Sequence, residues 1–189
     1  MKSPFGFIVE PIGGRYRNTT DIGGTEFIRS TSVEDHKATT REALVLETPL
    51  RYKGPIKIGD KLLVHHNVFR QYYDLKQGKS SSNAYFFNDK FIVGSEEFFA
   101  YHDGKDWNAV DRYCLVKPIE EENRVLQFDT FQKEKALVVE MAYPNKYLSS
   151  KSILKLDKVV CKPDSKYEFV IDGEVYYIMY DHQIVAKWM

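Results

Sequence analysis

Short apolar runs separated by turn signals limit this chain to a few fold classes. Glycines and Asn-Asp or Asp-Gly pairs lie between the runs, and an Asp-Gly pair between two apolar strands is a strong hairpin signal. No stretch longer than about ten residues keeps a helical period. The pattern therefore predicts an all-β protein, built as a sandwich or a barrel. The runs are FGFIVEP, EALVLETP, IKIGDKLLVHH, AYFFNDKFIVG, RYCLVKPI, KALVVEMAY, ILKLDKVVCK, KYEFVIDGEVYYIM and QIVAKW.

Four blocks of this pattern recur in the same order along the chain. One such match can be a coincidence, but four in sequence order favour an internal duplication. In the third pair, Gly59 is missing from the second copy. The pairs are FIVEPI (7–12) with CLVKPI (114–119), REALVLE (41–47) with EKALVVE (134–140), IKIGDKLLVHH (56–66) with LKLDKVVCK (154–162), and IVGSEEFFAY (92–101) with IMYDHQIVAK (178–187).

The duplication predicts two β domains, residues 1–102 and 112–189, with a linker between them. Each is close to the lower size limit for an independent core, and exposed strand edges need partners. We therefore expect neighbouring copies to pair with each other. Two long polar segments, a mobile loop over 18–37 and an insertion over 67–85, are predicted for the first domain. The second domain has the shorter EEENRVLQFDTFQKE, without a Gly-Gly pair, in place of the first of these.

The polar stretch DIGGTEFIRSTSVEDHK carries two large apolar residues, Phe27 and Ile28, shortly after Gly23 and Gly24. A buried loop would need partners for every backbone group, and a solvent loop has no use for two adjacent apolar side chains. We interpret the stretch as a recognition loop, in which the glycines keep the backbone free. The alternative is an ordinary surface excursion whose Phe27 and Ile28 fold back on their own barrel.

Composition sets limits on the partners and the compartment. The 189 residues have a formal net charge of +0, whereas proteins that bind nucleic acid usually have a basic surplus. No run of about 18 apolar residues is present, and the N-terminus lacks the features of a signal peptide. We expect a cytoplasmic protein with no membrane or nucleic-acid partner. Cys114 and Cys161 are expected to be small buried hydrophobes in a reducing compartment, the alternative being a disulfide between them.

No arrangement typical of catalysis or of metal binding stands out. Nucleotide-binding, serine-hydrolase and zinc-protease motifs are absent from the sequence. His65 and His66 are adjacent on an expected strand, so they should point to opposite faces and not share a metal. FRQYYDLKQGK mixes basic and aromatic residues as single-strand nucleic-acid binders do, but the zero net charge argues against that function. We therefore predict no enzyme, no catalytic residue, no metal and no cofactor.

The ordered blocks resemble the GroES-like co-chaperonins, the lids of chaperonin folding chambers. FIVEP, IGGTEFI, REALVLE, IKIGDKLLVHH and EEFFAY follow the order of the family's segments, and the second copy ends in HQIVAKW, close to the family's ending. Some phage-encoded co-chaperonins diverge this far while keeping the fold. Two features depart from the family pattern. Thr25 and Glu26 separate the Gly-Gly pair from the apolar residues, and only TPLRYKGP occupies the place of the family's roof hairpin.

This resemblance implies two tandem GroES-like, partly open β-barrels that form a lid assisting protein folding. The lid would dock on a chaperonin ring, which binds the ATP, in the cytoplasm of the host cell if the protein is phage-encoded. The chaperonin-binding residues it implies are Gly23, Gly24, Thr25, Glu26, Phe27 and Ile28.

The resemblance also implies a homo-oligomeric ring, in which the last strand of one chain pairs with the first strand of its neighbour. The subunit-interface residues would then be Phe7, Ile8, Val9, Ile184, Val185 and Ala186. An alternative from another class is a duplicated β-barrel module of a virion or other assembly, without a chaperonin partner. The segment Asn67–Tyr85 would be its interaction element.

Overall fold

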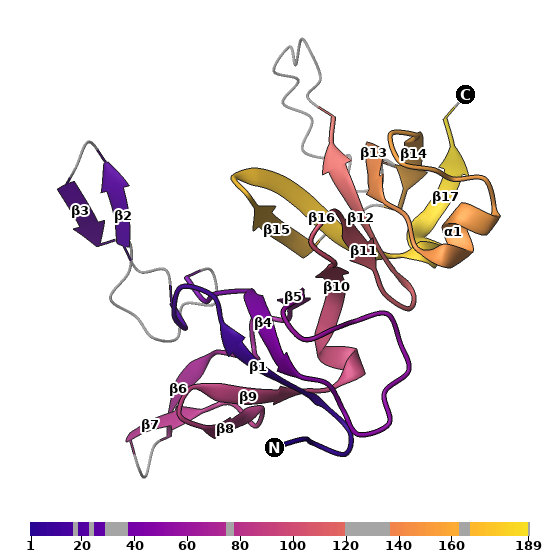
Figure 1. Ribbon diagram of the computed structural model, residues 1–189. Helices are drawn as coiled ribbons and strands as arrows, with labels where there is room; N and C mark the ends of the chain where they lie inside the picture. The colour runs from indigo at the N-terminus through magenta and orange to yellow at the C-terminus, as the bar shows by residue number, and fades with distance from the viewer. Residues whose placement is uncertain are drawn as a thin grey trace. The chain divides into compact units, whose positions relative to one another are not determined.

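The computed structural model describes residues 1–16, 19–22, 25–28, 38–74, 78–119, 137–162 and 167–188 (Figure 1). These residues are mostly in antiparallel strands, so the prediction of an all-β protein is confirmed. The chain divides into two compact units, Met1–Asp106 and Trp107–Met189, and the division falls inside the segment expected to be the linker. Within the described residues, no helix has the length and hydrophobicity needed to cross a membrane.

Within the first unit, the strands of the main sheet follow the order β10-β5-β4-β1-β9-β8. Two hairpins, β2–β3 and β6–β7, each form a two-stranded sheet of their own, and a 3-10 turn, η1, precedes β10. The elements are β1 (Phe7–Pro11), β2 (Thr19–Ile22), β3 (Thr25–Ile28), β4 (Glu42–Glu47), β5 (Lys61–Val64), β6 (Gln71–Asp74), β7 (Gly78–Ser81), β8 (Tyr85–Phe87), β9 (Lys90–Val93), η1 (Ser95–Glu97) and β10 (Phe98–His102).

The second unit has the sheet order β17-β14-β13-β12-β16-β15. A short helix, α1, lies between β13 and β14, and a 3-10 turn, η2, precedes β17. The elements are β11 (Trp107–Ala109), β12 (Tyr113–Pro118), β13 (Leu137–Tyr143), α1 (Lys146–Ser150), β14 (Lys158–Cys161), β15 (Tyr167–Ile171), β16 (Glu174–Tyr180), η2 (Asp181–Gln183) and β17 (Ile184–Lys187).

The two sheets have the same strand order, with β1 matching β12 and β10 matching β17. They also share irregularities. The pairing of β1 with β4 shifts between Ile8 and Val9, and that of β12 with β13 shifts at the matching place, between Leu115 and Val116. Among the described strands, β8 is not paired with β10, nor β15 with β17, so neither sheet closes into a complete barrel.

The strand register corrects one of the four sequence matches. Matching REALVLE with EKALVVE aligns Val45 with Val138, whereas the sheets align Val45 with Met141, because these two residues pair with Val9 and Val116. The difference is three residues. A shift by an odd number moves every side chain of a strand to the other face, and Val45 and Met141 are both buried. The match between the two sequences thus predicted a register that would turn the buried side chains of the strand away from the core.

The turn before β5 recurs before β14, with no residue missing. In the first unit Gly59 donates to Val45 O (2.9 Å), and the Asp60 carboxylate accepts from Lys57 N (2.7 Å). In the second, Leu156 donates to Met141 O (2.7 Å), and the Asp157 carboxylate accepts from Leu154 N (2.7 Å). Leu156 therefore occupies the place of Gly59, and the predicted deletion is wrong. Both residues have a left-handed backbone, with φ of 91° for Gly59 and 72° for Leu156.

Leu156→Gly is expected to stabilise the second unit. A non-glycine residue in the left-handed region costs roughly 1–2 kcal/mol. Glycine avoids this cost but loses about 0.5–1 kcal/mol more conformational entropy on folding. Since Leu156 is exposed, little burial is lost. We expect the free energy of unfolding, measured with urea, to increase by up to about 1 kcal/mol. Both tryptophans, Trp107 and Trp188, belong to the second unit, so their fluorescence reports its unfolding.

The matched control for this change is Leu154→Gly. Leu154 is also exposed but does not have a positive φ. Its replacement should lower the free energy of unfolding by about 0.5–1 kcal/mol. Equal losses in both variants would show that the Leu156 backbone carries no strain.

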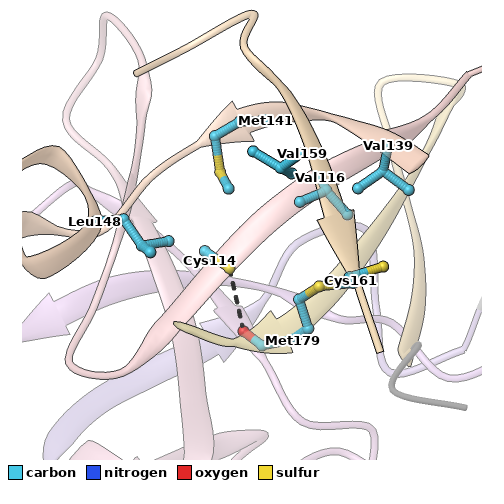
Figure 2. Packing of buried hydrophobic residues seen from close by; sticks show 8 residues of the cluster. All are labelled: Cys114, Val116, Val139, Met141, Leu148, Val159, Cys161 and Met179. Atoms are coloured by element: carbon cyan, nitrogen blue, oxygen red, sulfur yellow. Dashed lines mark hydrogen bonds between the residues drawn. The ribbon is translucent and has the colours of Figure 1, made fainter. Parts of the chain in front are cut away.

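The core of the second unit contains side chains from strands β12, β13, β14 and β16 and from helix α1 (Figure 2). Both cysteines lie in this core and are free, so no disulfide joins them. The Cys114 thiol donates a hydrogen bond to Met179 O (3.6 Å), and burial raises its pKa to about 12. The cluster consists of Cys114, Val116, Val139, Met141, Leu148, Val159, Cys161 and Met179.

The buried Cys114 thiol predicts a loss of stability at alkaline pH. From its ordinary pKa of 9.0 up to about 12, the unfolded thiol ionises while the folded one keeps its proton. The unfolded state then binds fewer protons, so the free energy of unfolding falls as the pH rises, by up to about 1.4 kcal/mol per pH unit from this group. Urea unfolding followed by tryptophan fluorescence between pH 9 and 11 should show a shallower slope for Cys114→Ala. Identical slopes would contradict the assignment.

Candidate partner-binding site

The segment predicted to be a recognition loop contains the β2–β3 hairpin. Its cross-strand pairs are Thr19–Ile28, Thr20–Phe27, Asp21–Glu26 and Ile22–Thr25. Gly23 and Gly24 lie outside the described residues. In the sequence they are the two residues between Ile22 and Thr25.

Alternation along the strands divides the hairpin positions between two faces. Phe27 and Ile28 are consecutive in β3 and belong to opposite faces. Phe27 shares its face with Ile22 of β2, together with Thr20 and Thr25. Ile22 was not among the residues expected from the sequence, although the two-residue period of a strand places it on the same face as Phe27.

The hairpin has few features that would stabilise it on its own. It forms a separate sheet, and an isolated two-stranded hairpin is marginally stable in water. Positions 21 and 26, both acidic, are direct cross-strand partners, and like charges at such positions are destabilising. A partner that adds contacts to this hairpin would therefore stabilise it further.

A short stem closes the base of the excursion that carries the hairpin. Tyr16 and Thr39 form an antiparallel bridge. Thr40 donates its backbone N–H to Arg15 O (2.9 Å) and its hydroxyl to Gly14 O (2.6 Å). Thr39 and Thr40 are buried, so the stem belongs to the folded body of the first unit.

The predicted interface residues on β1 already have partners within the chain. β1 pairs with β4 on one side and with β9 on the other, and Phe7, Ile8 and Val9 are all buried. A strand from another chain could pair with β1 only by displacing one of these neighbours. The edge-to-edge contact expected for β1 is therefore not available in this fold. An interface role for these three side chains remains a prediction.

The predicted interface residues on β17 lie at a sheet edge. Within the sheet of the second unit, β17 pairs with β14 alone. Val185 is 53% exposed, whereas Phe99, which occupies the same bulge position in β10, is 6% exposed. Ile184 is half-buried and Ala186 is exposed. Of the two predicted interface strands, β17 thus has the accessible side chains and backbone edge.

Other candidate sites are weak. His65 and His66 follow the end of β5, and their ring centroids are 4.1 Å apart, so the expectation that they point to opposite faces is wrong. Among the described residues, no group of three or more His, Cys, Asp or Glu side chains could hold a metal ion. A cavity of about 230 Å³ in the first unit has Glu47 and Lys90 as its charged lining residues. It is smaller than the roughly 300–1,000 Å³ of typical ligand pockets.

Comparisons with models of known protein families and with curated proteins found no match for this chain. The fold and the candidate site define its class: an all-β chain of two sheets with the same strand order in their own units, in which the first unit carries the separate β2–β3 hairpin.

Proposed function

We propose that this chain is a co-chaperonin-like lid that docks on a chaperonin ring through the β2–β3 hairpin and thereby assists protein folding. The observation that carries the proposal is the hairpin, which forms a sheet of its own and places Ile22 and Phe27 on one face. The Gly23-Gly24 pair lies between its strands, as in the resemblance to the co-chaperonin family. ATP hydrolysis belongs to the chaperonin, and the lid performs no bond chemistry.

The free energies of burial and of ordering are consistent with weak binding by each hairpin and strong binding by a ring of hairpins. Burial of one large apolar side chain contributes roughly 1.5–3 kcal/mol. Ordering a segment on binding costs about 2–5 kcal/mol, so a single hairpin binds weakly. Several hairpins on one ring multiply these contacts through effective concentration. Weak individual contacts also allow the lid to leave in each cycle.

The same proposal includes two GroES-like, partly open barrels per chain. The repeated strand order supports it. Consecutive residues on the central strands are buried, Ile8 and Val9 on β1 and Leu115 and Val116 on β12. Consecutive strand residues point to opposite faces, so both faces of these strands are covered, which a strongly curled sheet explains.

Assembly is proposed to use the exposed edge of β17. A free strand edge is a template for pairing with another chain, and head-to-tail pairing gives closed rings or open filaments. Because both sides of β1 are occupied, the second chain is proposed to offer a strand other than β1, or side-chain contacts to Val185 and Ala186.

Co-purification tests the proposal. The tagged protein is incubated with a chaperonin in the presence of ATP, ADP or no nucleotide, and its mass in solution is measured separately. We expect nucleotide-dependent capture by the chaperonin and a mass of several chains. Absence of capture in every nucleotide state would overturn the lid function. A stable oligomer without capture would instead favour the assembly module.

A further inference from the structure

Arg15 connects three parts of the first unit. Its guanidinium donates from Nε to Phe69 O (3.1 Å) and from Nη1 to the Ser81 hydroxyl (3.2 Å). Its central carbon lies 5.1 Å from the ring centroid of Phe91 and 5.7 Å from that of Tyr85, on β9 and β8. The Arg15 side chain is only 11% exposed, and this burial lowers the pKa of the guanidinium. A buried charge in such a place requires good geometry from its partners.

The two bonds from Arg15 reach both ends of the β6–β7 arm, residues 70–81. Phe69 precedes β6, and Ser81 is the last residue of β7. Phe69 is fully buried, with its ring centroid 4.8 Å from that of Phe91. One side chain thus ties the base of the arm to the main sheet.

The neighbouring residue, Tyr16, links the same arm to the stem of the hairpin excursion. The backbone N–H of Gln71 in β6 donates to the Tyr16 hydroxyl. Tyr16 also forms the stem bridge with Thr39, and the Arg15 carbonyl accepts from Thr40. The stem that leads to β2 and β3 therefore contacts the base of the arm through two consecutive residues.

The arm and the β2–β3 hairpin both belong to the first copy of the repeat. In the first unit, the arm lies between β5 and β8, and the β2–β3 hairpin lies between β1 and β4. In the second unit, only residues 162–166 separate the matching strands β14 and β15, so there is no room for an arm. In the first unit, the base of the arm contacts the stem residues Arg15 and Tyr16.

We propose that the β6–β7 arm supports the β2–β3 hairpin, with Arg15 and Tyr16 as the positioning residues that hold the stem of the hairpin on the base of the arm. This assigns a role to an insertion that the second copy lacks. The use of such positioning for docking rests on the proposed lid function, whereas the coupling of arm and hairpin does not.

The test measures the position of the hairpin without any partner. Nitroxide labels are attached at Glu26→Cys in β3 and at Glu96→Cys in η1, and the distance distribution between them is measured by pulsed electron resonance. Cys114 and Cys161 are buried in the folded chain, so labelling is directed to the new thiols. Arg15→Met should broaden the distribution about twofold or more, because the stem loses its attachment.

Three further variants sharpen the result. Tyr16→Phe removes only the acceptor of the Gln71 amide and should also broaden the distribution. Arg15→Lys should not restore the wild-type width, since an ammonium cannot reproduce the fork that reaches Phe69 and Ser81. The matched control is Lys117→Met, which removes an ion pair and a cation–π contact in the second unit and should leave the width unchanged.

Thermal unfolding of each variant separates positioning from loss of fold. The proposal is supported if Tyr16→Phe broadens the distribution while its melting temperature stays at the wild-type value. It is overturned if folded Arg15→Met and Tyr16→Phe keep the wild-type width, or if Lys117→Met broadens the distribution as much as they do. None of these outcomes depends on a chaperonin, so failure of the lid function would be recognised separately.

Discussion

Replacing Ile22 and Phe27 together with serine is expected to reduce capture by a chaperonin about 100-fold or more. Each side chain contributes roughly 1.5–3 kcal/mol when buried, so removal of both costs about 3–6 kcal/mol for one hairpin. Each 1.4 kcal/mol corresponds to about tenfold in affinity. The two residues share one face of the hairpin. Capture is measured by surface-immobilised chaperonin with nucleotide present.

The control for this double variant is Ile28→Ser, which lies on the opposite face. If the hairpin docks by one face, Ile28→Ser should weaken capture far less than Phe27→Ser. If Phe27 and Ile28 act as an extended pair in a loop, the two single variants should be equally damaging. Since β2 and β3 form a separate sheet, the melting temperature should stay the same in all variants. A collapse of folding stability with unchanged capture would contradict the docking role.

Asn145→Asp is expected to lower the free energy of unfolding of the second unit by about 3 kcal/mol or more at neutral pH. Asn145 is 1% exposed, and its Oδ1 caps α1 by accepting from Leu148 N (2.8 Å). Its Nδ2 donates to Asp111 O (3.0 Å) and to the Asp181 carboxylate (2.9 Å). An aspartate in this place removes both donated bonds and sets two carboxylates against each other.

Asn145→Ala separates these contributions. It removes the helix cap, worth about 0.5–2 kcal/mol, and a hydrogen bond to a charged group, worth about 1.5–3 kcal/mol, without adding a charge. Asn145→Asp should therefore be the less stable of the two at pH 7 and should approach Asn145→Ala in acid, where the carboxylates are protonated. Urea unfolding followed by tryptophan fluorescence measures both. Lys146→Ala, at the exposed start of the same helix, is the control. Equal stability of Asn145→Asp and wild type would show that the contact with Asp181 contributes nothing to the free energy of unfolding.

The all-β class and most of the repeat register could be predicted from sequence because they depend on local chemistry. Alternation and turn residues act over a few positions. The matching of 92–101 with 178–187 holds at each paired position, because both segments contain the same turn. The Glu97 side chain accepts from Gly94 N in one, and the Gln183 side chain accepts from Tyr180 N in the other.

The features that could not be predicted depend on contacts between distant segments. Similar letters placed REALVLE three residues out of register, since strand register is set by the partners and the core on each face. Likewise, nothing near Phe7 in the chain indicates that β9 occupies the second side of β1.

The same distinction separates the parts of the candidate site. Gly23, Gly24 and Phe27 led to the proposed recognition segment through residue types alone, because glycine freedom and side-chain hydrophobicity are local properties. The bonds from Arg15 to Phe69 and Ser81 join residues that local patterns do not relate. Composition and periodicity thus indicated which segments are strands and where a partner could bind. Long-range pairing in the folded chain determined which strand edges are free and which segments the Arg15 side chain joins.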